Sequence, residues 1–126
     1  MYQVEVIHVK DLAFEVKSGE ESFVIDAKGK GLTPLDALLS GLGSCVGVYI
    51  RKYAESSNLG LEKFKVSVEA ELTKESPFMF KIISVSVDLN GVGLDERRKN
   101  ALSEFIKNCP VHNTLKGNPQ IQVKIL

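Results

Sequence analysis

The stretch GLTPLDALLSGLGSC, residues 31–45, decides how the chain folds because it contains a nearly complete helix start. Thr33 is a favourable N-cap residue, Pro34 fits the first helical position, and Asp36 follows the cap by three residues, as a capping-box acid does. Apolar residues then recur at helical spacing well beyond the quoted stretch. The pattern predicts a helix over about 34–56. Because its apolar residues cover most sides, we expect this helix to be buried on more than one face.

The same segment is rich in small residues. Gly43 and Gly47 lie on one side of the predicted helix, flanked by Ser40, Gly41 and Ser44. Glycine inside a helix costs about 1 kcal/mol relative to alanine, so several small residues together indicate a packing reason. We therefore expect another backbone to approach this side of the helix closely.

Runs of alternating apolar residues flank the helix on both sides. Three short runs precede it, at 2–6, 12–16 and 23–25, and predict an antiparallel meander. Two longer alternating runs, a second amphipathic helix, a short helical turn and a last alternating run follow it. Their ranges are 64–72, 83–89, about 94–108, 111–115 and 121–125. The element order βββ-α-ββ-α-β has no βαβ run, so it predicts an α+β fold.

Length and composition limit the class of protein. The 126 residues show no internal repeat or composition break, so we expect a single domain over 1–126. Lys and Arg together number 16, as do Asp and Glu, whereas a nucleic-acid-binding module would show a basic excess. The N-terminus lacks the features of a secretory signal, and the longest uncharged stretch, 37–50, falls short of the roughly 20 residues of a membrane span. We expect a cytoplasmic protein that binds neither nucleic acid nor membrane.

The two cysteines, Cys45 and Cys109, fall on the apolar sides of the two predicted helices. Buried cysteines commonly act as small hydrophobic residues, so inert packing is one interpretation. If Pro110 begins a short helix, however, Cys109 is its N-cap, where free N–H groups favour a thiolate. The spacing Cys109-x-x-His112 is half of a zinc site, but Cys45 and His8 supply no second matching pair. Without an export signal, we expect two thiols or a redox-active pair.

Two segments of the sequence carry a family resemblance. The stretch 31–45 and the stretch CPVHNTLKG, residues 109–117, resemble the central-helix entry and the second-cysteine segment of OsmC/Ohr-type proteins. The element order and the separation of the cysteines also agree with that family. The resemblance implies an intertwined homodimer in which two central helices pack against each other, with the side that carries Gly43 and Gly47 at their contact.

The resemblance also implies a reaction. Cys45 is expected to attack the terminal oxygen of an organic hydroperoxide and to become a sulfenic acid. Cys109 is expected to condense with it to a disulfide, which a thiol reductant reopens; dithiols of the lipoyl type do so in some members. No metal, flavin or haem is implied. The expected role is peroxide detoxification in the oxidative stress response.

Two charged residues of the peroxide-reducing members are replaced in this sequence. Those members use an arginine from the N-terminal strands, but no arginine precedes Arg51, and Leu35 stands where its glutamate partner would be. Lys17, Lys28 and His8 are candidates to replace the arginine, and the sequence selects none of them. Two further functions stay open: a non-enzymatic redox sensor, and a dimer that binds a small apolar ligand. The rate of thiol loss after addition of an organic hydroperoxide separates the three functions.

Overall fold

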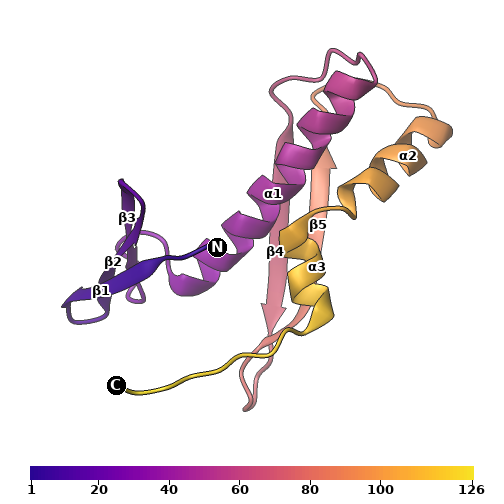
Figure 1. Cartoon of the computed structure of the whole chain (residues 1–126). Coiled ribbons are helices and arrows are strands. Elements are labelled where there is room, and N and C mark those ends of the chain that lie inside the picture. The colour runs from indigo at the N-terminus through magenta and orange to yellow at the C-terminus, as the bar shows by residue number, and fades with distance from the viewer. The chain divides into compact units, whose positions relative to one another are not determined.

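The computed structural model describes all 126 residues and divides into two compact units, residues 1–40 and 41–126. The boundary falls inside the long helix α1 (Pro34–Ser56), so each unit contains part of that helix. Figure 1 shows the order of the elements along the chain. None of the helices is both long and apolar enough to cross a membrane.

The first unit contains a three-stranded antiparallel sheet, which confirms the predicted meander. Its strands, in spatial order, are β1 (Glu5–Lys10), β2 (Ala13–Ser18) and β3 (Glu21–Asp26). β1 lies later in the chain than predicted. Its pairing with β2 starts at Glu5 and runs to Lys10, and the turn follows at Asp11, whose φ is 49°. Val16 in the central strand is paired with Val6 and Phe23, and it is the one buried side chain of this sheet.

Helix α1 begins where the sequence predicts. The Thr33 hydroxyl oxygen accepts a hydrogen bond from the Asp36 backbone N–H, and the Asp36 carboxylate accepts one from the Thr33 N–H, both at 3.1 Å. This capping box satisfies two backbone donors that a helix start would otherwise leave free. The helix ends at Ser56, just before Asn58 adopts a left-handed conformation with φ 54°.

The second unit packs α1 against an antiparallel hairpin, with two further helices alongside α1 (Figure 1). These elements are β4 (Lys65–Leu72), β5 (Phe80–Asp88), α2 (Glu96–Ile106) and α3 (Pro110–Gly117). α2 is shorter than predicted because Asp95 caps its start, accepting a 2.8 Å hydrogen bond from the Arg98 N–H, and Lys107 caps its end. α3 confirms the predicted turn of helix after Pro110.

The core of this unit forms between α1 and the elements around it. One cluster of buried side chains joins Leu42, Val46, Ile50, Ala54, Leu61, Leu102 and Cys109. Aromatic rings extend the contact between α1 and α2, since Tyr49 and Tyr53 lie 5.9 and 5.8 Å from Phe105 between ring centroids. The core therefore fixes the relative positions of the two cysteine-bearing segments.

The small-residue side of α1 faces β4 of the same chain. A Cβ placed on Gly43 would lie 3.0 Å from Cγ2 of Val68, and one on Gly47 would lie 3.8 Å from Cε2 of Phe64. A close approach occurs at Gly43, but it is made by the Val68 side chain of β4, whereas we expected another backbone and the resemblance implied a second copy of the helix. The β-branched side chain of Val68 needs this room against the helix, so packing within the chain explains Gly43 but not Gly47.

The predicted last strand, 121–125, is not formed. Residues 118–126 have no regular secondary structure, and the side chains of Ile121, Val123 and Ile125 are 83%, 87% and 97% exposed. A strand requires an edge with which to form hydrogen bonds, and this segment pairs with none within the chain. The alternation of apolar residues was read correctly, but it does not say where a partner strand comes from.

Candidate active site

Cys109 lies at the junction of α2 and α3. It is the N-cap residue of α3, Pro110 takes the first helical position, and the Cys109 sulfur accepts a hydrogen bond from the His112 backbone N–H at 3.4 Å. This confirms the N-cap position that the sequence indicates. The side chain has no solvent-exposed surface and belongs to the core cluster.

Cys45 lies in the middle of α1, where its half-buried side chain packs against the same cluster. The two residues are free thiols, and the Cys45 thiol is near enough to Cys109 to raise the pKa of the Cys109 thiol. Residues far apart in the sequence therefore lie near each other, as the apolar sides of the predicted helices indicated. This proximity is compatible with a disulfide between them after oxidation.

The electrostatics of Cys109 differ from the sequence-based expectation. Burial, which penalises the charged form, raises the pKa of the Cys109 thiol, and the neighbouring Cys45 thiol raises it further. Hydrogen bonds from the backbone N–H groups of His112 and Val111 act in the opposite direction but do not outweigh burial. The N–H groups at this N-cap position do favour the thiolate, as the sequence indicated, but burial and the Cys45 thiol raise the pKa of Cys109 overall.

The candidate partners for a thiolate are placed as follows. Arg51 is engaged elsewhere: its guanidinium donates to the Leu61 carbonyl at 2.7 Å and lies 3.4 Å from the Glu55 carboxylate. The Nε2–H of His8 donates a hydrogen bond to the Asp11 carbonyl at 2.9 Å, and the Lys17 ammonium is 3.4 Å from the Glu15 carboxylate.

Three of the residues weighed as charged partners belong to the first unit. His8, Lys17 and Lys28 fall within residues 1–40, whereas both thiols fall within residues 41–126. Asp36 caps the start of α1. Hydrogen bonds from Thr33, mainly from its backbone N–H and then from its side chain, hold the pKa of the Asp36 carboxyl below the ordinary value. A role for one of these cations at Cys45 stays a prediction.

The spacing Cys109-x-x-His112 has a simpler explanation than metal ligation. The Cys109 sulfur accepts a hydrogen bond from the His112 N–H as a helix cap, and an N-cap side chain reaches the N–H three residues further along. No group of three or more His, Cys, Asp or Glu side chains in the chain is arranged to hold a metal ion.

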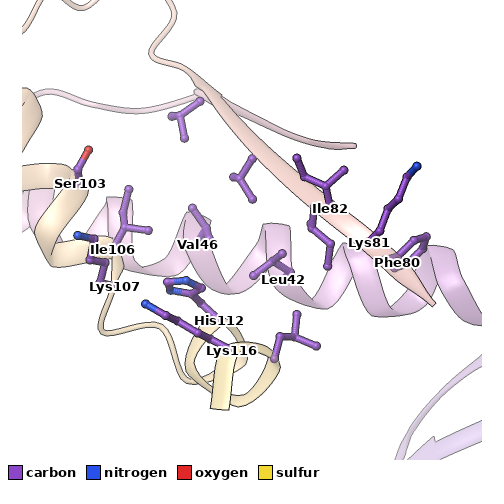
Figure 2. A pocket seen from close by; sticks show the side chains of 14 residues that line it. Leu42, Val46, Phe80, Lys81, Ile82, Ser103, Ile106, Lys107, His112 and Lys116 are labelled. Carbon is purple, nitrogen blue, oxygen red and sulfur yellow. The ribbon is translucent and has the colours of Figure 1, made fainter. Parts of the chain in front are cut away.

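A cavity next to the thiol pair was not foreseen. It has a volume of about 640 Å³, and its lining includes Leu42 and Val46, which flank Cys45 along α1, together with His112 and Lys116 of α3 (Figure 2). The available signal was the spacing of His112 and Lys116, since residues four apart share one face of a helix. The spacing places His112 and Lys116 on one face of α3, but it does not predict that this face borders a cavity.

Comparison with known proteins now decides the family. Residues 27–124 match the family model described as OsmC-like protein. The chain belongs to the OsmC-like protein family. Two curated relatives from Mycoplasma genitalium and Mycoplasma pneumoniae, each named hydroperoxide reductase, are 25% and 24% identical to it, and each alignment covers 98% of this chain and 93% of the relative. The crystal structure of an OsmC-like protein from Mycoplasma pneumoniae matches with a TM-score of 0.80 and 24% identity, over 93% of this chain and 88% of the other.

Membership of this OsmC-like family confirms the resemblance and the α+β fold inferred from the sequence. The two segments that carried the resemblance, 31–45 and 109–117, both fall inside the matched residues. They contain the two cysteines that the structure brings together.

Proposed function

We propose that this OsmC-like protein reduces organic hydroperoxides, with Cys45 as the attacking thiol and Cys109 as the resolving thiol. The observation that carries the proposal is the proximity of two free thiols of unequal exposure. The half-buried thiol is the one that a peroxide can reach, and the fully buried one is already next to it. The names of the two Mycoplasma relatives support the same reaction.

The reaction has two steps in which atoms and electrons balance. The Cys45 thiolate attacks the terminal peroxide oxygen, the O–O bond breaks, and the alkoxide takes a proton and leaves as an alcohol, so Cys45 becomes a sulfenic acid. Cys109 then gives up its proton and attacks the sulfur of Cys45, a disulfide forms, and water leaves. A dithiol, of which lipoyl is one type, returns two electrons and restores both thiols.

The raised pKa of Cys109 supports this division of roles. A buried thiol that stays protonated is a poor first nucleophile, because the thiolate is the reactive form. It remains available to attack a sulfenic acid that forms on the neighbouring Cys45. The raised pKa of Cys109 thus supports the assignment of Cys45 as the attacking thiol, which the resemblance implies, over Cys109, which its N-cap position favours.

Single-cysteine variants test the proposal. With one equivalent of cumene hydroperoxide, the wild-type protein is expected to lose both thiols within seconds. Cys109→Ser is expected to react once and to leave a sulfenic acid at Cys45 that dimedone traps, while Cys45→Ser is expected not to react. Thiol titration and mass spectrometry measure both outcomes.

Three results would contradict parts of the proposal. Loss of thiols only over many minutes indicates a redox sensor, and no loss in any variant indicates structural cysteines. Trapping of a sulfenic acid at Cys109 in Cys45→Ser reverses the roles.

We further propose that residues 1–126 act as one domain within a homodimer in the cytoplasm. The chain buries only eight hydrophobic side chains, and many apolar residues of β1, β3 and the C-terminal segment are exposed. Large apolar side chains exposed in this number are typical of an interface between subunits. Light scattering is expected to give about twice the chain mass of 13.9 kDa.

A further inference from the structure

The cavity next to the thiol pair has apolar walls. It lies between α1, β5, α2 and α3, all within residues 41–126, and its volume is about 640 Å³ (Figure 2). Sites for small organic ligands usually measure about 300–1,000 Å³ and are lined mainly by hydrophobic side chains. The apolar lining includes Leu42, Val46, Ile83, Val85, Ile106 and Leu115.

Four basic side chains also line this cavity, and they differ in whether a carboxylate neutralises them. The ammonium of Lys81 lies 2.9 Å from Glu71, and that of Lys107 lies 2.8 Å from Glu104. Lys116 and His112 have no carboxylate within 4.0 Å anywhere in the chain. Among the lysines that line this cavity, Lys116 of α3 is the one without a carboxylate beside it.

The two unpaired side chains, His112 and Lys116, line the same part of the cavity. His112 and Lys116 are four residues apart on α3, and Figure 2 shows them together beneath Val46, while the Lys81 side chain points away from them. An ammonium has three donors and an imidazole has at least one, and neither group finds an acceptor in the chain. A ligand with two acceptor oxygens would satisfy donors of both side chains.

We infer that this cavity binds an organic acid of the fatty-acid type, with its carboxylate between Lys116 and His112 and its apolar chain against the cavity walls. Hydrogen bonds between ionised partners are about twice as strong as neutral ones. Apolar walls next to the head group lower the local dielectric and strengthen the attraction further. The apolar volume favours a hydrocarbon chain over a small inorganic anion.

The inference is independent of peroxide reduction. Neither cysteine lines the cavity, and binding requires no electron transfer. Binding and thiol loss are separate measurements, so each proposal can fail while the other holds.

A fluorescent acid and its neutral ester test the inference. The probe is a dansyl-labelled undecanoic acid, compared with its methyl ester, on the reduced full-length protein. The acid is expected to bind about tenfold more tightly than the ester, the change expected from one good charge-assisted interaction. The double variant Lys116→Gln, His112→Gln is expected to remove this preference and to leave binding of the ester unchanged.

Two further variants serve as controls. Lys74→Gln removes an exposed lysine that does not line the cavity and is expected to bind like the wild type. Val85→Trp fills the cavity from β5 and is expected to weaken acid and ester alike. Circular dichroism checks that each variant is folded, and if the double variant is not, the acid–ester comparison on the wild type decides alone.

Either of two results overturns the inference. Equal binding of acid and ester by the wild type means that the cavity has no anion subsite. Absence of binding for both probes means that something else fills the cavity, and a second copy of the chain is then the first candidate.

Discussion

Replacing Gly43 with alanine is expected to destabilise the protein although alanine is the better helix former. The substitution gains about 1 kcal/mol of helix propensity. However, the new Cβ would lie 3.0 Å from Cγ2 of Val68, inside the roughly 3.5–4.0 Å at which carbon atoms attract. Overpacking of this kind costs about 1–3 kcal/mol, because a valine side chain has few alternative rotamers and β4 must move. The net change is a loss of about 0–2 kcal/mol.

Gly47 provides a matched control one turn further along α1. A Cβ there would lie 3.8 Å from Cε2 of Phe64, which is an ordinary contact distance. Gly47→Ala is therefore expected to keep the whole gain of about 1 kcal/mol. The two alanine variants should differ by about 1–3 kcal/mol, and Val68→Ala should abolish most of the penalty at Gly43 in a double-mutant cycle.

Urea unfolding followed by circular dichroism, at several protein concentrations, measures these free energies. If Gly43→Ala stabilises the protein as much as Gly47→Ala does, then β4 does not press on this face of α1, and the packing argument fails. If Gly47→Ala instead destabilises the protein, and more so on dilution, a second copy of the helix packs at Gly47, because the stability of a dimer depends on concentration.

Three other predictions concern the cap of α1 and the thiols. Thr33→Ala is expected to cost about 1 kcal/mol, the usual value of an N-cap side chain. The pKa of Asp36 is lowered in the folded protein, so the stability from this carboxylate is present above about pH 4. It is lost as the pH falls through the folded-state pKa. The urea midpoints of the wild type and Asp36→Asn should therefore converge at low pH. In Cys45→Ser, alkylation of Cys109 by iodoacetamide should be at least about tenfold slower in the native state at pH 8 than in urea, since Cys109 is buried with a raised pKa; equal rates would contradict its burial.

Features determined within a few residues of each other were predictable from the sequence. The capping box at Thr33, the start and end of α1, and the N-cap position of Cys109 all depend on local hydrogen bonds that have fixed spacings. The alternation in β4 and β5 was equally clear, because both strands bury one face against α1. The helical spacing also indicated that both cysteines point inward, so their contact could be anticipated.

Features determined by tertiary contact were not predictable in the same way. The N-cap position of Cys109 suggested an ionised thiol, but the depth of burial decides its pKa, and no local pattern gives that depth. The alternation at 121–125 required a partner strand that the chain does not supply. The cavity depends on how α3 is placed against β5, so the shared face of His112 and Lys116 acquires meaning only in the folded unit.

The surroundings of the thiols connect the proposed reaction with the proposed assembly. The Cys45 thiol has the Cys109 thiol as a neighbour, and no basic side chain of residues 41–126 forms a hydrogen bond with either sulfur. A thiol without a cation nearby gains no stabilisation of its thiolate, and the thiolate is the form that attacks a peroxide. If the proposed reaction is correct, we expect residues 1–40, where His8, Lys17 and Lys28 lie, or a second copy of the chain to supply that cation. Peroxide reduction and the docking of that segment should then be lost together, whereas binding of an organic acid by α3 should persist.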